Sequence, residues 1–411
     1  MPPLLSISPA HPLRNRSFRK LLAFRIQVVF AYQIIVVVAG WHVYELTHDA
    51  LALGLIGLAE VIPYFCFALF AGYAVDHHSR RMFGVLAALL AGLNALLLLA
   101  TTVMAPGHPT LWIYGAIACG GVARAFIGPS YNALFALTLP REQYARAAGI
   151  GSSAFQIALV AGPALGGALV GWASMAAAYA LSAMLAIGAA ITLWTLRIAE
   201  PAPAKSAAVF ASIGEGLRFV FGKQILLAAQ ALDMFAVLFG GAVAMLPAFI
   251  HDIFHYGPEG LGILRAAPAV GAIIIGIILS RYTLSKHAGW WLLGAVAGFG
   301  LCIIAFALSI NFWLAAFLLL LSGICDGVSV VMRATIMQLT TPDEMRGRVA
   351  SINGIFIGSS NELGAFESGV AARLMGLIPS VIFGGVMTLV VVATTAYFAP
   401  KLRKLDLQKL H

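Results

Sequence analysis

The feature that most constrains this sequence is a succession of twelve apolar segments, each long enough to cross a membrane as a helix. The hydrocarbon core of a bilayer is about 30 Å thick and takes about 20 helical residues to cross. Of the 411 residues, 61% are hydrophobic and only 10% are charged, whereas soluble domains are about 25% charged. The predicted spans are 22–46, 51–75, 82–104, 111–138, 147–171, 174–196, 225–250, 259–280, 289–309, 312–339, 349–374 and 379–399. We therefore expect an all-α integral membrane protein with twelve transmembrane helices.

The basic residues sort to one side of these segments. Of the 25 Lys and Arg, 21 lie in the N-terminal flank, in every second loop, in the central connection or in the C-terminal tail. With twelve spans these regions share one face, and the positive-inside rule makes that face cytoplasmic. Both termini are then cytoplasmic. The net charge of +9 therefore indicates membrane topology and not a nucleic-acid-binding surface.

A mixed stretch near the middle divides the spans into six and six. We expect an N-terminal six-helix bundle over 1–197, a cytoplasmic central linker over 198–223 and a C-terminal bundle over 224–411. The halves resemble each other, because Pro140–Glu142 in one loop matches Pro342–Glu344 in the equivalent loop. Internal symmetry of this kind is typical of repeat-built transporters, whose substrate site lies near the membrane midplane. Chance likeness between apolar helices is the alternative.

The loop between the second and third spans contains Gly72, Asp76, Arg80 and Arg81. The three charged side chains can make charge-assisted hydrogen bonds at abutting helix ends, and Gly72 would let two helices come close. The spacing resembles the G-x-x-x-D-R-x-G-R-[KR] signature of the major facilitator superfamily, with His and Ser at two of its positions. The resemblance extends to the span count and the central linker, and it implies two six-helix bundles related by a pseudo-two-fold axis.

A charge inside a membrane span is costly and marks a functional candidate, and nine charged residues of the predicted spans are such candidates. They are Glu60, Arg124, Asp233, Arg265, Asp326, Arg333, Glu362, Glu367 and Arg373. Asp326 and Arg333 are seven residues apart, so they share a helix face. Arg124 begins an R-x-x-x-G pattern that resembles one linked to proton transfer in proton-coupled members of the superfamily.

In this superfamily spans 1, 4, 7 and 10 line the central cavity. The resemblance therefore implies a substrate and proton pocket surrounded by Arg124, Asp233, Asp326 and Arg333, with Glu362 and Glu367 as further candidates in span 11. Interhelical ion pairs that lock the helices together are the alternative. Glu60 and Arg265 each precede a span proline by three residues, at equivalent places in the two halves. Because span 2 packs on span 11 in the family, we expect Glu60 near Arg373 at an outer gate.

Span 5 contains Gly162, Pro163, Gly166 and Gly167, whose small side chains allow tight helix packing around a proline bend. This stretch resembles the G-P-x-x-G-G motif of the superfamily's exporters. Span 11 and the end of span 1 look like the bacterial branch of enterobactin exporters and transmembrane secretion effectors. The resemblance implies proton-coupled export of small amphipathic molecules, such as drugs or siderophores, across the bacterial inner membrane. An importer or facilitator of a nutrient or metal chelate, or a lipid flippase, is the alternative.

The sequence contains no H-E-x-x-H, G-x-S-x-G or nucleotide-binding-loop motif, so we do not expect an enzyme. Without ATP hydrolysis by this chain, a proton gradient is the expected energy source, and we expect no cofactor. His251 and His255 have the i, i+4 spacing of a metal pair, but a solvated loop is the better interpretation. The expected partners are a small-molecule substrate, protons and membrane lipids, with the protein as a monomer.

Overall fold

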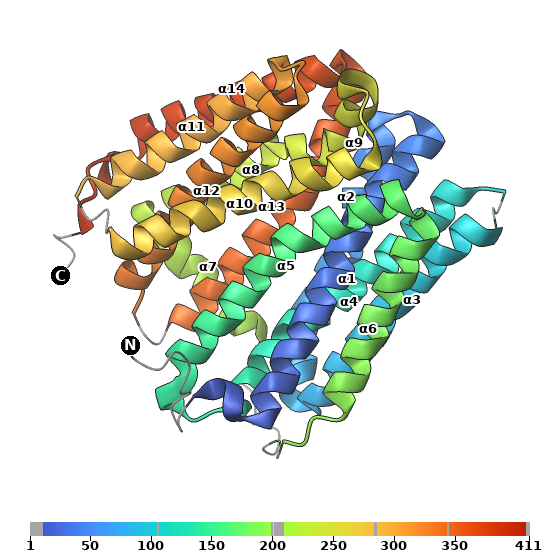
Figure 1. Cartoon of the computed structure of the whole chain (residues 1–411). Helices are drawn as coiled ribbons and strands as arrows, with labels where there is room; N and C mark the ends of the chain where they lie inside the picture. Colours follow the sequence, from blue (N-terminus) through green and yellow to red (C-terminus); the bar gives the residue numbers. More distant parts are fainter. Residues whose placement is uncertain are drawn as a thin grey trace, which may run out of the picture. The chain divides into compact units, whose positions relative to one another are not determined.

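The computed structural model describes residues 11–104, 107–198, 200, 209–282, 286–342 and 345–407. This part of the chain is helical and contains no strand (Figure 1). Its elements in chain order are η1 (Pro12–Arg14), α1 (Arg16–Thr47), α2 (Ala50–His77), α3 (Arg80–Met104), α4 (Pro109–Thr138), η2 (Arg141–Gln143), α5 (Tyr144–Trp172), α6 (Met175–Trp194), α7 (Val209–Gly222), α8 (Gln224–Phe239), η3 (Gly241–Met245), α9 (Leu246–Ala248), η4 (Phe249–Phe254), α10 (Pro258–Arg281), α11 (Ala288–Leu308), α12 (Phe312–Thr340), α13 (Arg346–Met375), α14 (Leu377–Phe398) and α15 (Pro400–Arg403).

The predicted all-α membrane fold is confirmed. Within the described residues, 11 helical segments are long and apolar enough to cross a membrane. The segment Gln224–Phe254, which contains α8, η3, α9 and η4, counts as one of them. The 30-residue α13 is a further long helix at the place of the eleventh predicted span. Each of the twelve predicted spans therefore coincides with a long helical segment.

For the seventh span, 225–250, we expect one continuous helix, but the structure shows a helix that is interrupted. The α-helix α8 ends at Phe239, the 3-10 turn η3 follows, and η4 is a π-helix. Pro247 stands at the start of α9 and has no N–H for a helical hydrogen bond. At Gly240 the packing is close, because a Cβ there would lie 2.6 Å from the Phe299 ring. Glycine and proline therefore explain where this span changes its winding.

The second half of the predicted central linker is helical. The helix α7 occupies Val209–Gly222 and packs on α8 and α13. Its Val220 is buried whereas Phe221 is exposed. Neighbouring apolar residues of α7 thus differ in burial, as in a helix with one covered face.

The chain divides into two compact units, which we describe separately. The first unit comprises residues 1–39 and 62–205, and the second comprises 40–61 and 206–411. The segment Gly40–Val61 contains the end of α1 and the start of α2, and it packs with the second unit. We call it the α1–α2 hairpin. The division at 198–223 into two six-helix bundles stays a prediction.

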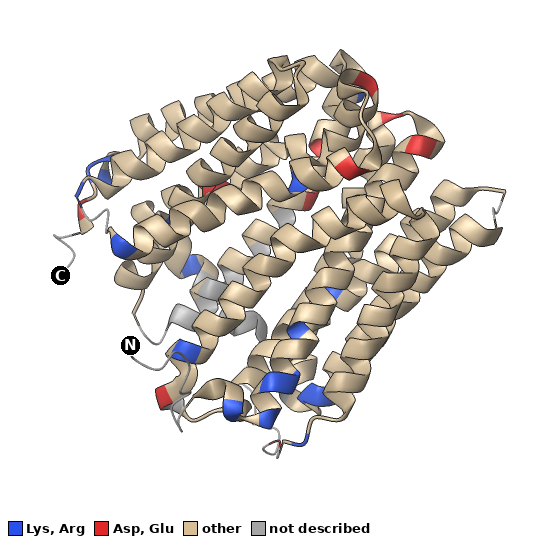
Figure 2. Cartoon of the chain, in the orientation of Figure 1, with Lys and Arg blue, Asp and Glu red and all other residues tan. Residues whose placement is uncertain are grey.

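In the first unit, α3 packs against both α4 and α6. Basic side chains bind the carbonyls at the end of α6. Lys20 donates to the Thr195 carbonyl at 2.7 Å, and Arg81 donates to the Leu196 carbonyl at 2.8 Å. Cations at a helix C-terminus are stabilised by the helix dipole. Figure 2 shows Lys and Arg gathered at this end of the first unit's helices.

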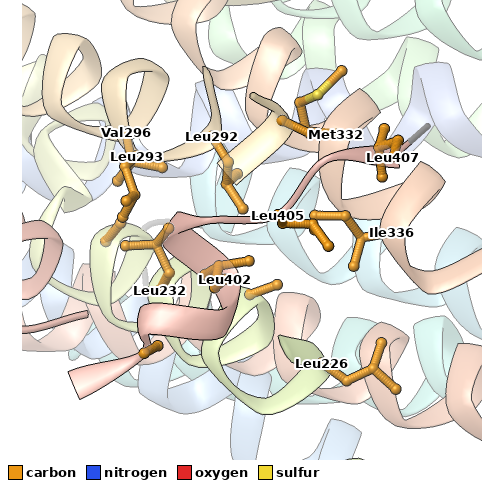
Figure 3. Packing of buried hydrophobic residues seen from close by; sticks show 14 residues of the cluster. Leu226, Leu232, Leu292, Leu293, Val296, Met332, Ile336, Leu402, Leu405 and Leu407 are labelled. Atoms are coloured by element: carbon orange, nitrogen blue, oxygen red, sulfur yellow. The ribbon is translucent and has the colours of Figure 1, made fainter. Parts of the chain in front are cut away.

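In the second unit, α12 packs against α10 and α11, and α11 also packs against α14. The chain after α14 folds back onto these helices. Leu402, Leu405 and Leu407 lie in a buried cluster with Leu292 and Ile336 (Figure 3). The C-terminal segment therefore forms part of the hydrophobic core of this unit.

Candidate functional site

An ion pair between α8 and α12 lies inside the second unit. Asp233 on α8 is 7% exposed, and its Oδ2 lies 2.5 Å from Nη1 of Arg333 on α12. Arg333 also donates from Nε to the Ser329 hydroxyl at 3.3 Å. Asp326 lies close enough to interact electrostatically with both partners. Three of the four residues predicted for the central pocket are thus brought together, with two carboxylates around one guanidinium.

In this arrangement a carboxylate can either bind a proton or form a salt bridge with Arg333. Two carboxylates close together disfavour each other's charged form, whereas a guanidinium favours it. In the structure Arg333 forms its ion pair with Asp233, while Asp326 interacts with Arg333 electrostatically. Protonation of the paired carboxylate would weaken its hold on Arg333, and a ligand whose binding displaces that proton would let the pair form again. The cluster is therefore chemically suited to couple proton binding to ligand binding.

Arg124 on α4 belongs to the first unit. Its Nη1 donates to the Tyr32 hydroxyl at 3.0 Å. Its guanidinium carbon lies 5.2 Å from the Tyr32 ring centroid and 5.3 Å from that of Tyr64, which are cation–π distances. Aromatic side chains from α1 and α2 therefore surround this charge. A pocket shared by Arg124 and the ion-pair cluster stays a prediction.

The two acids predicted in span 11 lie on α13. Glu367 is partly buried, and its Oε2 accepts a hydrogen bond from the Ser368 hydroxyl at 3.4 Å. Glu362 lies where α13 approaches α2. A Cβ built on Gly57 would be only 2.5 Å from the Glu362 carbonyl oxygen, so the two backbones nearly touch.

The predicted outer gate has a different carboxylate from the one expected. Arg373 at the end of α13 forms an ion pair with Asp49, which immediately precedes α2. Glu60 lies about three turns further along α2 and is buried at 5% exposure, whereas the Arg373 side chain is 61% exposed. Asp49 therefore replaces Glu60 as the described partner. Arg265 lies partly buried on α10, in the turn before Pro268.

The loop between α2 and α3 is bonded to the start of the central linker. Glu200 accepts hydrogen bonds from the backbone N–H of Arg80 at 2.7 Å, from that of Arg81 at 3.3 Å and from the Ser79 hydroxyl at 3.0 Å. A carboxylate at this place satisfies the free N–H groups at the start of α3. This cap was not predictable from the sequence, because Glu200 lies far from the loop in the chain.

Gly72 and Asp76 are the two other residues that were predicted to matter in this loop. A Cβ on Gly72 would meet no described atom within 4 Å, so the structure does not require glycine there for helix packing. Asp76 lies in α2, but its side chain is outside the described part of the structure.

The glycines of α5 do bring two helices together. A Cβ built on Gly162 would lie 2.6 Å from Cβ of Gln33 on α1, and one on Gly166 would lie 3.3 Å from Cα of Ile34. Gly162, Pro163, Gly166 and Gly167 are all buried. Side chains at these glycines would push α5 away from α1, as the small-residue pattern predicts.

A polar cluster that sequence reasoning missed lines a cavity of about 440 Å³ in the second unit. Its walls include Tyr44, His48, Asp49, Asp252 and Arg373, from α1, the turn before α2, η4 and α13. Most of the second unit's Asp and Glu lie toward the end at which α9 is found (Figure 2). The sequence offers one sign of this cluster, a run of polar residues between the first two spans, and such a run is ordinary in a loop. No group of three or more His, Cys, Asp or Glu side chains in the described residues is placed to hold a metal ion.

Comparisons with known proteins agree with this architecture. A family model described as the Major Facilitator Superfamily matches residues 22–365. The chain belongs to the major facilitator superfamily. It is therefore a multi-pass membrane transporter that moves a small molecule, and not an enzyme.

Individual relatives are distant but cover nearly the whole chain. The multidrug efflux pump Tap of Mycolicibacterium fortuitum is 26% identical over 397 residues, covering 91% of this chain and 93% of Tap. The enterobactin exporter EntS of Escherichia coli is 25% identical over 404 residues, covering 94% of each chain. A bacterial homologue of the human lysosomal transporter Spinster, solved inward-facing and occupied, has a TM-score of 0.74 at 15% identity. It covers 95% of this chain and 97% of its own, and it shows the fold alone.

Proposed function

We propose that this protein is a proton-coupled exporter of small amphipathic molecules, such as drugs or siderophores. Relatives named as a multidrug efflux pump and an enterobactin exporter support this direction of transport. The G-P-x-x-G-G stretch in α5, which packs tightly on α1, also supports it. The protein then lies in the bacterial inner membrane with both termini cytoplasmic, works as a monomer among membrane lipids and needs no cofactor.

The observation that carries the coupling is the ion pair of Asp233 and Arg333 beside Asp326. In the proposed cycle of alternating access, a proton from outside neutralises one acid and weakens its hold on Arg333. The proton leaves on the cytoplasmic side as substrate binds, and the pair then forms again. Each state of the cluster thus holds either the proton or the substrate, which makes the exchange obligatory.

The proton gradient supplies enough free energy for this exchange. One proton that crosses about 100 mV releases about 2.3 kcal/mol. One pH unit adds about 1.4 kcal/mol. The sum of about 3.7 kcal/mol supports a gradient of about 500-fold for a neutral substrate at one proton per molecule.

Everted membrane vesicles that contain the protein test this function. A fluorescent dye that is an efflux substrate should accumulate in energised vesicles, and an uncoupler should abolish the accumulation. Asp233→Asn and Asp326→Asn should each abolish the accumulation driven by the proton gradient, because an amide does not release a proton. Glu142→Gln, at an exposed acid in the loop before α5, should transport normally. Ligand binding measured by thermal shift on the purified variants separates lost coupling from lost binding.

Other results would contradict the proposal. Accumulation that persists in both amide variants would exclude the ion-pair cluster as the proton site. Uptake of a nutrient or metal chelate by whole cells that requires this protein would indicate an importer. Movement of labelled lipid between leaflets of liposomes, with no dye transport, would indicate a flippase.

A further inference from the structure

The α1–α2 hairpin is held to the rest of the second unit by a group of polar contacts, which we call the hairpin clasp. Its members are Tyr44, His48, Asp49, His251, Asp252 and Arg373. Tyr44 near the end of α1 donates its hydroxyl hydrogen bond to Oδ2 of Asp252 on η4. Asp49 forms an ion pair with Arg373 at the end of α13. Both contacts join residues that are hundreds of positions apart in the chain.

Two imidazoles lie at the centre of this clasp. The ring centroids of His48 and His251 are 4.9 Å apart, and each lies 5.8 Å from the Tyr44 ring. Nδ1 of His251 lies 2.7 Å from Oδ1 of Asp252, so one carboxylate bonds both the imidazole and the Tyr44 hydroxyl. His48 has a positive φ of 47°, an uncommon conformation for a residue with a side chain. The turn between α1 and α2 therefore holds His48 against His251.

Below the clasp, α2 meets α13 through glycine. A Cβ on Gly54 would lie 3.0 Å from Cα of Gly369, and one on Gly57 would lie 2.5 Å from the Glu362 carbonyl oxygen. Surfaces made of glycine backbone do not interdigitate, so they can separate without unpacking large side chains. The polar contacts at the end of the hairpin are then the part of this interface that can be switched by charge.

We propose that the hairpin clasp is an acid-released latch that holds the α1–α2 hairpin against α13 and η4. With neutral imidazoles, the two carboxylates and one guanidinium give the clasp a charge of −1. The first proton makes it neutral and strengthens the bond between His251 and Asp252. The second proton places two imidazoliums side by side and makes the clasp positive, so the like charges repel. Imidazole is the side chain whose charge changes between about pH 5 and 8.

Among the described residues, the charged and titratable groups around the imidazole pair come from the hairpin, the region of η4 and α13. They are Tyr44, Glu45 and Asp49 from the hairpin, Asp252 and His255 from the region of η4, and Arg373 from α13. Glu45 is exposed, and His255 bonds the His251 backbone carbonyl at 3.1 Å. The inference rests on the proposed alternating access, in which acid outside the cell would open the transporter at this end and load it with protons.

Thiol labelling of the purified full-length protein measures opening of the clasp separately from transport. In a variant whose four native cysteines are replaced by alanine, Ala248→Cys places a thiol in the cavity wall at a residue that is 1% exposed. A bulky fluorescent maleimide reaches this thiol only when the hairpin leaves. Ala173→Cys, at an exposed residue after α5, provides the reference rate at each pH, which removes the effect of pH on the reagent.

The normalised labelling rate should rise about fivefold between about pH 7.5 and 5.5, since charging the second imidazole shifts the population toward the open form. His48→Gln with His251→Gln should abolish this rise. Tyr44→Phe and Asp49→Asn should each raise the rate at the higher pH by about threefold or more, because each removes one polar contact. Glu142→Gln, at an exposed acid in the first unit and outside the clasp, should leave the rate unchanged.

Equal rates at both pH values in the protein with an intact clasp would overturn the acid-released latch. So would a pH response that survives in the double glutamine variant. Unchanged rates in both Tyr44→Phe and Asp49→Asn would show that these contacts do not hold the hairpin. Each of these results concerns the hairpin alone, whereas failure of the proposed export would appear as lost dye accumulation with labelling intact.

Discussion

Burying an ion pair costs free energy of desolvation, and removing one partner of a buried pair destabilises the protein further. Asp233 and Arg333 are each about one-tenth exposed, so both have given up most of their hydration. Arg333→Gln leaves a carboxylate without its cation, and we expect a loss of about 3–5 kcal/mol in stability. Adding Asp233→Asn to Arg333→Gln should recover most of this loss, because neither charge then remains. Thermal unfolding in detergent measures both effects.

The exposed Glu142→Gln is the control for this experiment and should unfold at the temperature of the unmodified protein. A double variant no more stable than Arg333→Gln alone would mean that the loss comes from packing and not from an uncompensated charge.

The sequence predicted some members of these sites and missed others for a physical reason. Asp233, Asp326 and Arg333 stand out because each interrupts an apolar span. Their approach across α8 and α12 could be inferred only from the family resemblance. Asp49 and Asp252 were missed, because a carboxylate in a loop is ordinary until the fold places it opposite a partner.

At the scale of the elements, glycine decides which helices approach each other. Gly162 and Gly128 both lie within helices of the first unit, but a Cβ would meet Gln33 at 2.6 Å only at Gly162. We expect Gly162→Ala to destabilise the protein by about 1–3 kcal/mol through overpacking. Gly128→Ala should be neutral or stabilising by up to about 1 kcal/mol, because alanine favours the helix. Equal melting temperatures for the two variants would contradict close packing of α5 on α1.

The cap at the start of α3 gives a second prediction about an element. Glu200→Ala removes the acceptor for the N–H groups of Arg80 and Arg81, and we expect a loss of about 1 kcal/mol. Hydrogen exchange should then accelerate in the first turn of α3 and stay unchanged at its far end. Equal exchange rates in the first turn of α3 in the variant and the unmodified protein would show that water replaces the carboxylate without cost.

The positions of the elements were largely predictable, because about 20 apolar residues in succession have few alternatives to a spanning helix. The interruptions of the α-helix within a span were not predictable. Gly240, Gly241 and Pro247 end the regular winding of the seventh span, yet glycine and proline also occur in continuous membrane helices. Only the packing around them, such as Phe299 against Gly240, shows that this span changes its winding.

At the scale of the whole molecule, the sorted basic residues predict which side of the membrane each end of the helices faces. Ala173, after α5, and Gly222, at the end of α7, are both exposed, and they belong to opposite predicted sides. In intact cells and a cysteine-free background, a membrane-impermeant maleimide should label Ala173→Cys but not Gly222→Cys. Permeabilised cells should show labelling of both.

The reverse pattern would place the basic face outside and the hairpin clasp in the cytoplasm. An acid-released latch there would meet the near-neutral cytoplasm and could not respond to acid outside the cell. The sidedness of two cysteines therefore decides whether the clasp can sense the proton gradient that the ion pair of Asp233 and Arg333 is proposed to use.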